Sequence, residues 1–350
     1  MHRCLIFLFT IVLCGAAEPT SKTNANLQQI LKRFPAADSN RDGILTLAEA
    51  KVFQQKRRER EANRPQLKPT HEDIAYGTHA RHKLDLWLKE SDRPTPLLVC
   101  IHGGGFRAGD KSNYHRQVNL IKRMHAAGIS VASINYRFTE GGKNPLPIAM
   151  HDAARAVQFL RHNAKRFNLD KTRFAAAGSS AGACISMWLA FHDDLADADS
   201  DDPIRRESTR LIASAPSGGQ PTISPVTFRE WFGVKSLVEH PAMRAIYGLT
   251  GEGSIENWTP EIAERARISS PITYLTRDDP PCYQTYGSAN TPVTEKTRPN
   301  EWVHHPHLGI RLKEAMDKLG IECHVQYKDG PPIKGYGGAD DFLVKKLTGK

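Results

Sequence analysis

The chain has 350 residues, of which 39% are hydrophobic and 25% are charged. This length exceeds the usual size of one domain, and this composition is that of an ordinary soluble globular protein, which excludes a disordered or a fibrous chain. The formal net charge is +10, but Lys and Arg are spread along the chain and are dense only in residues 51–64. Because such a run is typical of a solvated helix and linker, we expect no nucleic-acid partner.

Residues 1–17 are predicted to be a signal peptide. A short basic start is followed by an apolar run, Cys4 to Leu13, and by small residues before a cleavage point after Ala17. About ten apolar residues cannot cross a bilayer core, which needs roughly 20. We therefore expect export, to the periplasm or the medium, and a mature chain without a transmembrane segment.

The next segment, residues 25–62, is predicted to be a small helical unit that binds calcium. Apolar residues follow a helical spacing over 26–34, and a second helix is expected from about Leu47. Between them residues 38–49 read DSNRDGILTLAE, which matches the EF-hand loop pattern D-x-[DN]-x-[DN]-G-x5-E. Calcium prefers six to eight oxygen ligands, and the loop offers them from Asp38, Asn40, Asp42, the carbonyl of Ile44, Thr46 through water, and Glu49.

Two features of this loop favour a weak, stabilising calcium site over a sensor. Only one such loop is present although EF-hands normally pair, and Pro35 lies where the entering helix would ordinarily continue. The alternative interpretation is a polar turn between two helices that binds no metal.

A linker is expected at residues 63–71 and a large domain at residues 72–348. Short apolar runs predict strands at 83–88, 96–101, 130–136, 173–177, 209–215, 281–286 and 322–327. Longer periodic runs predict helices at 114–127, 148–166, 181–191 and 307–319. This alternation predicts an α/β fold with a mostly parallel sheet flanked by helices.

A G-x-S-x-G motif contains the candidate nucleophile. Residues 178–182 read GSSAG and lie directly between a predicted strand and a predicted helix. A sharp turn in that context exposes the serine hydroxyl and directs the helix N-terminus at developing negative charge. We therefore expect Ser180 to be the catalytic nucleophile.

A glycine-rich turn upstream completes this part of the site. The predicted strand that ends at Ile101 is followed by the sequence HGGGF. Glycines allow main-chain amides to approach a tetrahedral intermediate closely. The expected oxyanion hole consists of the amides of Gly103, Gly104 and Ala181.

These motifs together resemble the esterase/lipase group of the α/β-hydrolases, in its hormone-sensitive-lipase-like and feruloyl-esterase-like branch. The resemblance rests on HGGGF at 102–106, AGDK at 108–111, INYR at 134–137 and GSSAG at 178–182, and it extends over about residues 74–342. It implies the α/β-hydrolase fold with an eight-stranded sheet, and hydrolysis of carboxylic esters through an acyl-enzyme on Ser180 without a catalytic cofactor. With the predicted export, it suggests a small-molecule or polysaccharide-linked ester as substrate. The EF-hand segment is an addition to the family pattern.

The resemblance also implies a catalytic acid and a histidine after the last two strands, and this chain lacks both at those places. Asn290 stands where the acid is expected, and Lys334 stands near the expected place of the histidine. One interpretation makes Lys334 the base, which requires burial to lower its pKa.

Another interpretation takes the base from residues 301–307, EWVHHPH. His304 or His305 would then serve Ser180, with Glu295 or Glu301 as the orienting acid. A third interpretation is that catalysis is lost and the pocket binds a ligand without hydrolysing it, because a serine hydroxyl is a poor nucleophile without a base.

Overall fold

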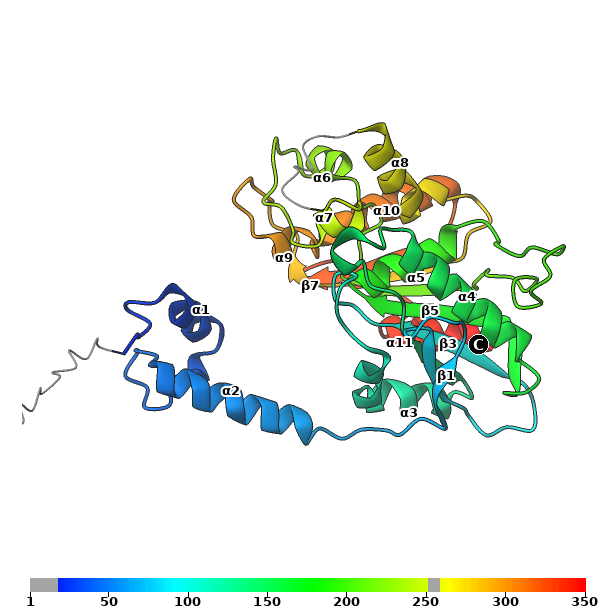
Figure 1. Ribbon diagram of the computed structural model, residues 1–350, viewed down its shortest axis with the longest axis horizontal. Coiled ribbons are helices and arrows are strands. Elements are labelled where there is room, and N and C mark those ends of the chain that lie inside the picture. The colour runs from blue at the N-terminus through cyan, green and yellow to red at the C-terminus, as the bar shows by residue number, and fades with distance from the viewer. Residues whose placement is uncertain (1–17, 251–258) are drawn as a thin grey trace, which may run out of the picture. The chain divides into compact units, whose positions relative to one another are not determined.

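The computed structural model describes residues 18–250 and 259–350 (Figure 1). The chain divides into two compact units between Pro65 and Gln66. The predicted signal peptide, residues 1–17, lies outside the described residues. Within the described ranges, no helix has both the length and the apolar content needed to span a membrane.

The N-terminal unit is a pair of helices around a small apolar core. Helix α1 (Ala25–Arg33) begins after Asn24, whose side chain accepts hydrogen bonds from the next main-chain amides. A 3-10 turn at Pro35–Ala37 ends this helical segment, and α2 (Leu47–Ala62) follows the predicted metal loop. The core of the unit consists of Leu27, Ala37, Leu45 and Ala50.

The second unit is built on an eight-stranded sheet with the order β1-β2-β4-β3-β5-β6-β7-β8. The strands are β1 (His71–Ala75), β2 (Lys83–Trp87), β3 (Thr95–Ile101), β4 (Ser130–Ile134), β5 (Leu169–Ser179), β6 (Ser214–Ser217), β7 (Cys282–Ala289) and β8 (Cys323–Lys328). Strand β2 pairs antiparallel with β1 and β4, and all other neighbours are parallel. The mostly parallel eight-stranded sheet is therefore confirmed.

Two strands differ from the sequence prediction for identifiable reasons. Strand β1 was not predicted because its residues are mostly exposed, which removes the apolar alternation that marks a strand. The strand predicted at 209–215 is observed as β6 at 214–217, and Ile212 and Ala213 before it also form main-chain hydrogen bonds with β5. Upstream of it, the guanidinium of Arg161 binds the carbonyls of Ser208 and Arg210, so these groups are bonded to a side chain.

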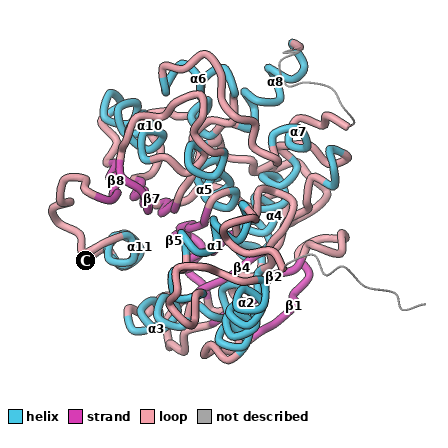
Figure 2. Tube along the Cα trace, turned by 90° about the vertical axis from the view of Figure 1, so that its left-hand side faces the viewer, coloured by secondary structure: helices cyan, strands magenta, loops and turns pink. Residues whose placement is uncertain are grey.

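Helices cover both faces of the sheet (Figures 1 and 2). Helices α4 (Ile148–His162), α5 (Ala181–Phe191) and α10 (Pro306–Leu319) pack on one face, and α3 (Val118–Ala126) and α11 (Ala339–Thr348) pack on the other. The buried strand β3 serves both layers. Leu97, Val99 and Ile101 face the first, while Leu98 and Cys100 face the second.

Further helices lie on the side of α5 and α10 (Figure 2). They are α6 (Pro225–Phe232), α7 (Met243–Ile246), α8 (Pro260–Ser269) and α9 (Pro299–Trp302). Trp302 of α9 contacts the region after β6 at two points. Its indole donates to the carbonyl of Val238 at 2.9 Å, and its ring packs on Phe228 of α6. The loops after β6 and β7 are thus held together above the sheet.

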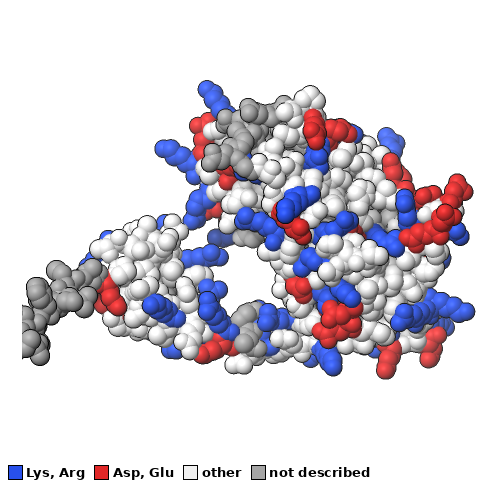
Figure 3. Space-filling model, viewed as in Figure 1, with Lys and Arg blue, Asp and Glu red and all other residues white. Residues whose placement is uncertain are grey.

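Basic and acidic side chains are interspersed on the face of this unit drawn in Figure 3. Several form pairs, such as Arg155 with Asp202 at 2.6 Å and Lys313 with Asp317 at 2.8 Å. The positive net charge is therefore not gathered into one patch on this face.

Candidate active site

Ser180 occupies a strained turn between β5 and α5. Its φ of 52° and ψ of −116° are unusual for a residue with a side chain. A Cβ atom on Gly178 would lie 2.2 Å from the carbonyl oxygen of Gly182, and one on Gly182 would lie 2.1 Å from that of Ile101. Both glycines are therefore required by close contact with the main chain. The amide of Ser180 donates to Ser217 at 2.9 Å, which fixes the turn to the end of β6.

The glycine-rich turn after β3 lies against this elbow. A Cβ atom on Gly103 would lie 2.7 Å from the carbonyl oxygen of Ser179, and Gly104 has a φ of +119° that favours glycine. Ala181 is the first residue of α5, directly after Ser180. The structure thus brings the three expected oxyanion donors, Gly103, Gly104 and Ala181, to the neighbourhood of the nucleophile.

His102 supports the glycine-rich turn. Its Nδ1 donates to the carbonyl of Gly103 at 2.8 Å, and its Nε2 accepts from Arg81 at 3.3 Å. Burial lowers the pKa of His102 to about 4, so the ring is neutral near pH 7. Both ring nitrogens are engaged away from Ser180, which gives His102 a supporting position.

His304 is the histidine that the structure brings to the nucleophile. Its Nε2 lies 2.8 Å from the Oγ of Ser180. Its Nδ1 lies 2.9 Å from the carbonyl oxygen of Asn300. Because a carbonyl only accepts, Nδ1 carries the proton and Nε2 is free to accept the serine hydroxyl.

The carbonyl of Asn300 was not anticipated from the sequence. It belongs to α9, and the two residues are related by the i, i+4 spacing of a helical turn. Pro299 is the first residue of that short helix, a position that proline favours. That proline and the spacing were signals from which this contact could have been inferred.

His305, the other histidine considered as a base, has a different position. Its Nε2 donates to the carbonyl of Thr291 at 2.8 Å, and its Nδ1 accepts the amide of His307 at 3.2 Å as the cap of α10. Burial lowers the pKa of His305. With both nitrogens bonded to the main chain, His305 is not available to Ser180, and its expected catalytic place is corrected to a structural one.

The remaining candidates for base and acid are on the surface. Lys334 is exposed in the loop after β8, so the burial that a lysine base requires is missing. Glu295 is exposed, and Glu301 is exposed and pairs with Arg298. The structure therefore brings neither glutamate to the Nδ1 of His304, which is bonded to a main-chain carbonyl.

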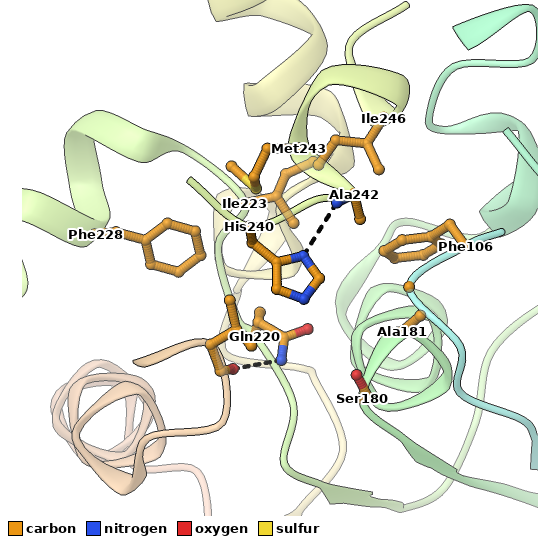
Figure 4. Close-up of a pocket in the computed structure, with 12 residues that line it drawn as sticks. Phe106, Ser180, Ala181, Gln220, Ile223, Phe228, His240, Ala242, Met243 and Ile246 are labelled. Atoms are coloured by element: carbon orange, nitrogen blue, oxygen red, sulfur yellow. Dashed lines mark hydrogen bonds between the residues drawn. The ribbon is translucent and has the colours of Figure 1, made fainter. Parts of the chain in front are cut away.

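A small apolar cavity of about 40 Å³ opens beside Ser180 (Figure 4). Its apolar wall includes Phe106, Ile223, Phe228, Met243 and Ile246. Its polar lining comes from Ser180, Gln220 and His240. Burial lowers the pKa of His240, and its Nδ1 accepts the amide of Ala242 at 3.2 Å.

A larger groove of about 590 Å³ lies on the other side of the base. Its polar residues include Ser288, Thr291, Thr297, Asn300, Glu301 and His304. Around the cavity and the groove, the sequence motifs account for Ser180, Ala181, the HGGGF residues Gly105 and Phe106, and the 301–307 segment. The other lining residues come from segments without a recognisable motif.

The metal loop predicted at 38–49 adopts a tight turn in which Gly43 has a φ of +80°. Asp38 accepts the amides of Arg41 and Gly43, each at 2.8 Å. The carboxylate of Glu49 accepts hydrogen bonds from Thr46 and Ser39, which lower its pKa to about 2. The oxygen-only donor set suits a hard cation, and Glu49 would exchange these bonds to coordinate it.

A second group of possible ligands, Glu72, Asp85 and His115, lies together in the second unit. Asp85 is already bonded by Lys111 and by His115, each at 2.8 Å. Because the ammonium of Lys111 already pairs with the carboxylate of Asp85, we interpret these residues as an ion-pair network and not as a metal site.

Comparisons with known proteins agree with the fold and with the geometry around Ser180. The model of the BD-FAE family matches residues 84–298, which is more than half of the chain. The chain belongs to the BD-FAE family. The matched segment contains the glycine-rich turn and Ser180, whereas His304 lies beyond its end.

Individual relatives of this BD-FAE member carry the names of enzymes, among them an esterase. A probable isoprenylcysteine alpha-carbonyl methylesterase of Arabidopsis thaliana is 28% identical over 54% of this chain and 42% of its own length. A probable tuliposide A-converting enzyme of Tulipa gesneriana is 28% identical over 79% of this chain and 63% of its own length. The chain thus spans less than two thirds of the length of either relative.

Solved structures show the same fold. A truncated carbohydrate esterase from gut microbiota superposes with a TM-score of 0.56 at 19% identity, over 82% of this chain and 96% of that one. At this identity the likeness shows the α/β-hydrolase fold.

Proposed function

We propose that this protein is a serine hydrolase of carboxylic esters, with Ser180 as nucleophile and His304 as base. The observation that carries the proposal is the 2.8 Å contact between Ser180 Oγ and His304 Nε2. This distance is within reach for proton transfer. The family and the names of the relatives support ester hydrolysis as the reaction.

The proposed mechanism follows from the positions of the donors. His304 accepts the hydroxyl proton as Ser180 Oγ attacks the ester carbonyl, and the amides of Gly103, Gly104 and Ala181 stabilise the oxyanion. The imidazolium then gives that proton to the departing alcohol, which leaves an acyl group on Ser180. Water, deprotonated by His304 in the same way, releases the acid and restores the serine.

The carbonyl of Asn300 takes the place of the usual carboxylate in this mechanism. It holds the ring orientation and the tautomer by accepting a hydrogen bond from the protonated Nδ1 at 2.9 Å. A neutral carbonyl stabilises the imidazolium less than a carboxylate does. We therefore expect a slower enzyme than one with a full triad.

The lining of the site favours an apolar acyl group. The cavity beside Ser180 has an apolar wall formed by Phe106, Ile223, Phe228, Met243 and Ile246, against which the acyl chain of an ester would pack. The groove beside His304, of about 590 Å³, contains the side chains of Ser288, Thr297 and Asn300, which can hydrogen-bond the hydroxyls of a sugar, as in a polysaccharide-linked ester.

The test compares hydrolysis and covalent labelling of the same preparations. We expect p-nitrophenyl acetate turnover and labelling by an organophosphonate in the wild type, and neither in Ser180→Ala. Binding of an acylated oligosaccharide without turnover or labelling would instead support the non-catalytic interpretation.

We also propose that residues 1–17 direct export. The basis is the pattern of a basic start, an apolar run and small residues before Ala17. N-terminal sequencing of the exported protein should begin at Glu18, and an intact Met1 on exported protein would contradict the proposal.

The loop 38–49 is proposed to bind one calcium ion that stabilises the N-terminal unit. Its oxygen donors and its match to the EF-hand pattern support this assignment. Titration calorimetry of the whole chain should show a site with Kd of about 0.1–1 mM, the range of extracellular modules. Glu49→Gln is the control, and absence of heat at millimolar calcium in the wild type would overturn the assignment.

A further inference from the structure

A buried glutamine joins the loop after β6 to the segment that carries the base. Gln220 is only 8% exposed. Its Nε2 donates to the carbonyl of Gly218 at 2.8 Å and to that of Val303 at 2.6 Å. Figure 4 shows the amide nitrogen directed at the second of these carbonyls. Because Val303 directly precedes His304, this bond fixes the main chain from which the imidazole extends.

The first of these carbonyls belongs to a residue that also contacts the base. Gly218 has a φ of +59°, and a Cβ atom there would lie 3.2 Å from Cδ2 of His304. Its amide donates to Thr285 at 2.7 Å, which fixes it to β7. The preceding residue, Ser217, accepts the amide of Ser180. The segment 217–218 therefore contacts both Ser180 and His304. The side chain of Gln220 connects this segment to Val303 by hydrogen bonds.

The site needs such a support because its base is not held by a carboxylate. Ser180 and His304 are 124 positions apart in the sequence, and the orienting partner of His304 is a neutral carbonyl. The distance between them is therefore set by hydrogen bonds between loops. A misplacement of about 1 Å in such a pair costs roughly 100-fold in rate.

We propose that Gln220 is a positioning residue that holds the main chain at Val303 and thereby keeps His304 at hydrogen-bond distance from Ser180. This inference rests on the proposed esterase function. Both of its partners are carbonyls, which only accept, so the amide group has one useful orientation and its nitrogen must face them. Removal of that nitrogen leaves two main-chain carbonyls without their donor and releases the segment that carries the base.

The experiment compares Gln220→Met with a matched control, Gln158→Met. Gln158 on α4 is also buried, and its Nε2 donates to the carbonyls of Leu195, Arg205 and Glu207 at 3.3, 3.1 and 2.9 Å. Both variants lose buried hydrogen bonds to the main chain, so both should lower Tm. Only Gln220→Met should lower kcat for p-nitrophenyl acetate, by about 10- to 100-fold, with KM within about three-fold of the wild type.

Two results would overturn the positioning role while the esterase function stands. One is wild-type kcat in folded Gln220→Met, and the other is an equal loss of kcat in Gln158→Met. If Gln220→Met does not fold, Gln220→Asn keeps a neutral amide but is one methylene shorter, so its nitrogen cannot reach both carbonyls, and the same loss of kcat is expected. Turnover that persists in Ser180→Ala would instead defeat the proposed function itself.

Discussion

The two halves of the candidate site are built in different ways. The half that contains Ser180 lies at the ends of β3 and β5, where main-chain contacts leave no room for a Cβ on Gly178 or Gly182. The half that contains His304 lies on the loop after β7 and is held by hydrogen bonds to main-chain carbonyls. Local sterics define the first half, whereas contacts between distant segments define the second. A substitution in the first should therefore affect folding, and one in the second should affect mainly the rate.

The largest expected effect tests whether the two halves act as one unit. Ser180→Ala and His304→Ala should each lower kcat/KM for p-nitrophenyl acetate by at least about 1,000-fold, and the double variant should lose little more. The reason is that the hydroxyl and the imidazole share a single proton transfer. More than a tenth of wild-type activity in His304→Ala would show that another group is the base.

The second prediction compares a glycine from each half. Gly182→Ala forces a Cβ to within 2.1 Å of a carbonyl oxygen, so we expect a loss of stability of about 2–4 kcal/mol, measured by urea unfolding. Gly218→Ala meets the ring of His304 at 3.2 Å and should fold, with about 1 kcal/mol of backbone strain and roughly ten-fold lower kcat. Equal losses of stability in the two variants would remove the distinction between the halves.

The third prediction concerns a buried carboxylate of α4, Asp152, and its behaviour in acid. Burial raises the pKa of Asp152, but hydrogen bonds from His82 and Arg137 outweigh it and hold the pKa at about 2, below the usual 3.8. A carboxyl with a lowered pKa in the folded state stabilises the protein above about pH 4, and this stabilisation is lost as the pH falls through about 2.

Asp152→Asn should therefore be less stable than the wild type by about 3 kcal/mol at pH 7, because it breaks a buried ion pair. Urea unfolding at several pH values should show this difference shrinking from about pH 4 downward. A difference that stays constant down to pH 2 would contradict the assigned pKa.

The smallest expected effect concerns the residue at the usual place of the histidine. Lys334 is exposed in the loop after β8. Lys334→Ala should therefore leave kcat within about two-fold and Tm unchanged, since exposed substitutions rarely shift stability by more than about 0.5 kcal/mol. A large loss of turnover would show that Lys334 takes part in catalysis.

Much of the fold was accessible from the sequence because its signals are local. The helix at 181–191 was predicted with the bounds that α5 has, and seven of the eight strands were anticipated because apolar runs mark buried strands. The edge strand β1 was missed because exposed residues carry no such pattern. The elbow and the glycine-rich turn were found because small residues at fixed spacing are needed wherever the main chain passes so close to itself.

By itself, the sequence determined the nucleophile half of the site and offered His304 as one of several bases. Only the tertiary structure decided among them, because His304, His305 and Lys334 differ in what surrounds them and not in any local pattern. The partner of His304 is a main-chain carbonyl, and the helical spacing that could suggest this contact does not show which histidine faces Ser180. The support from Gln220 likewise depends on two carbonyls 85 positions apart, which only the packing of the loops brings within reach of one amide.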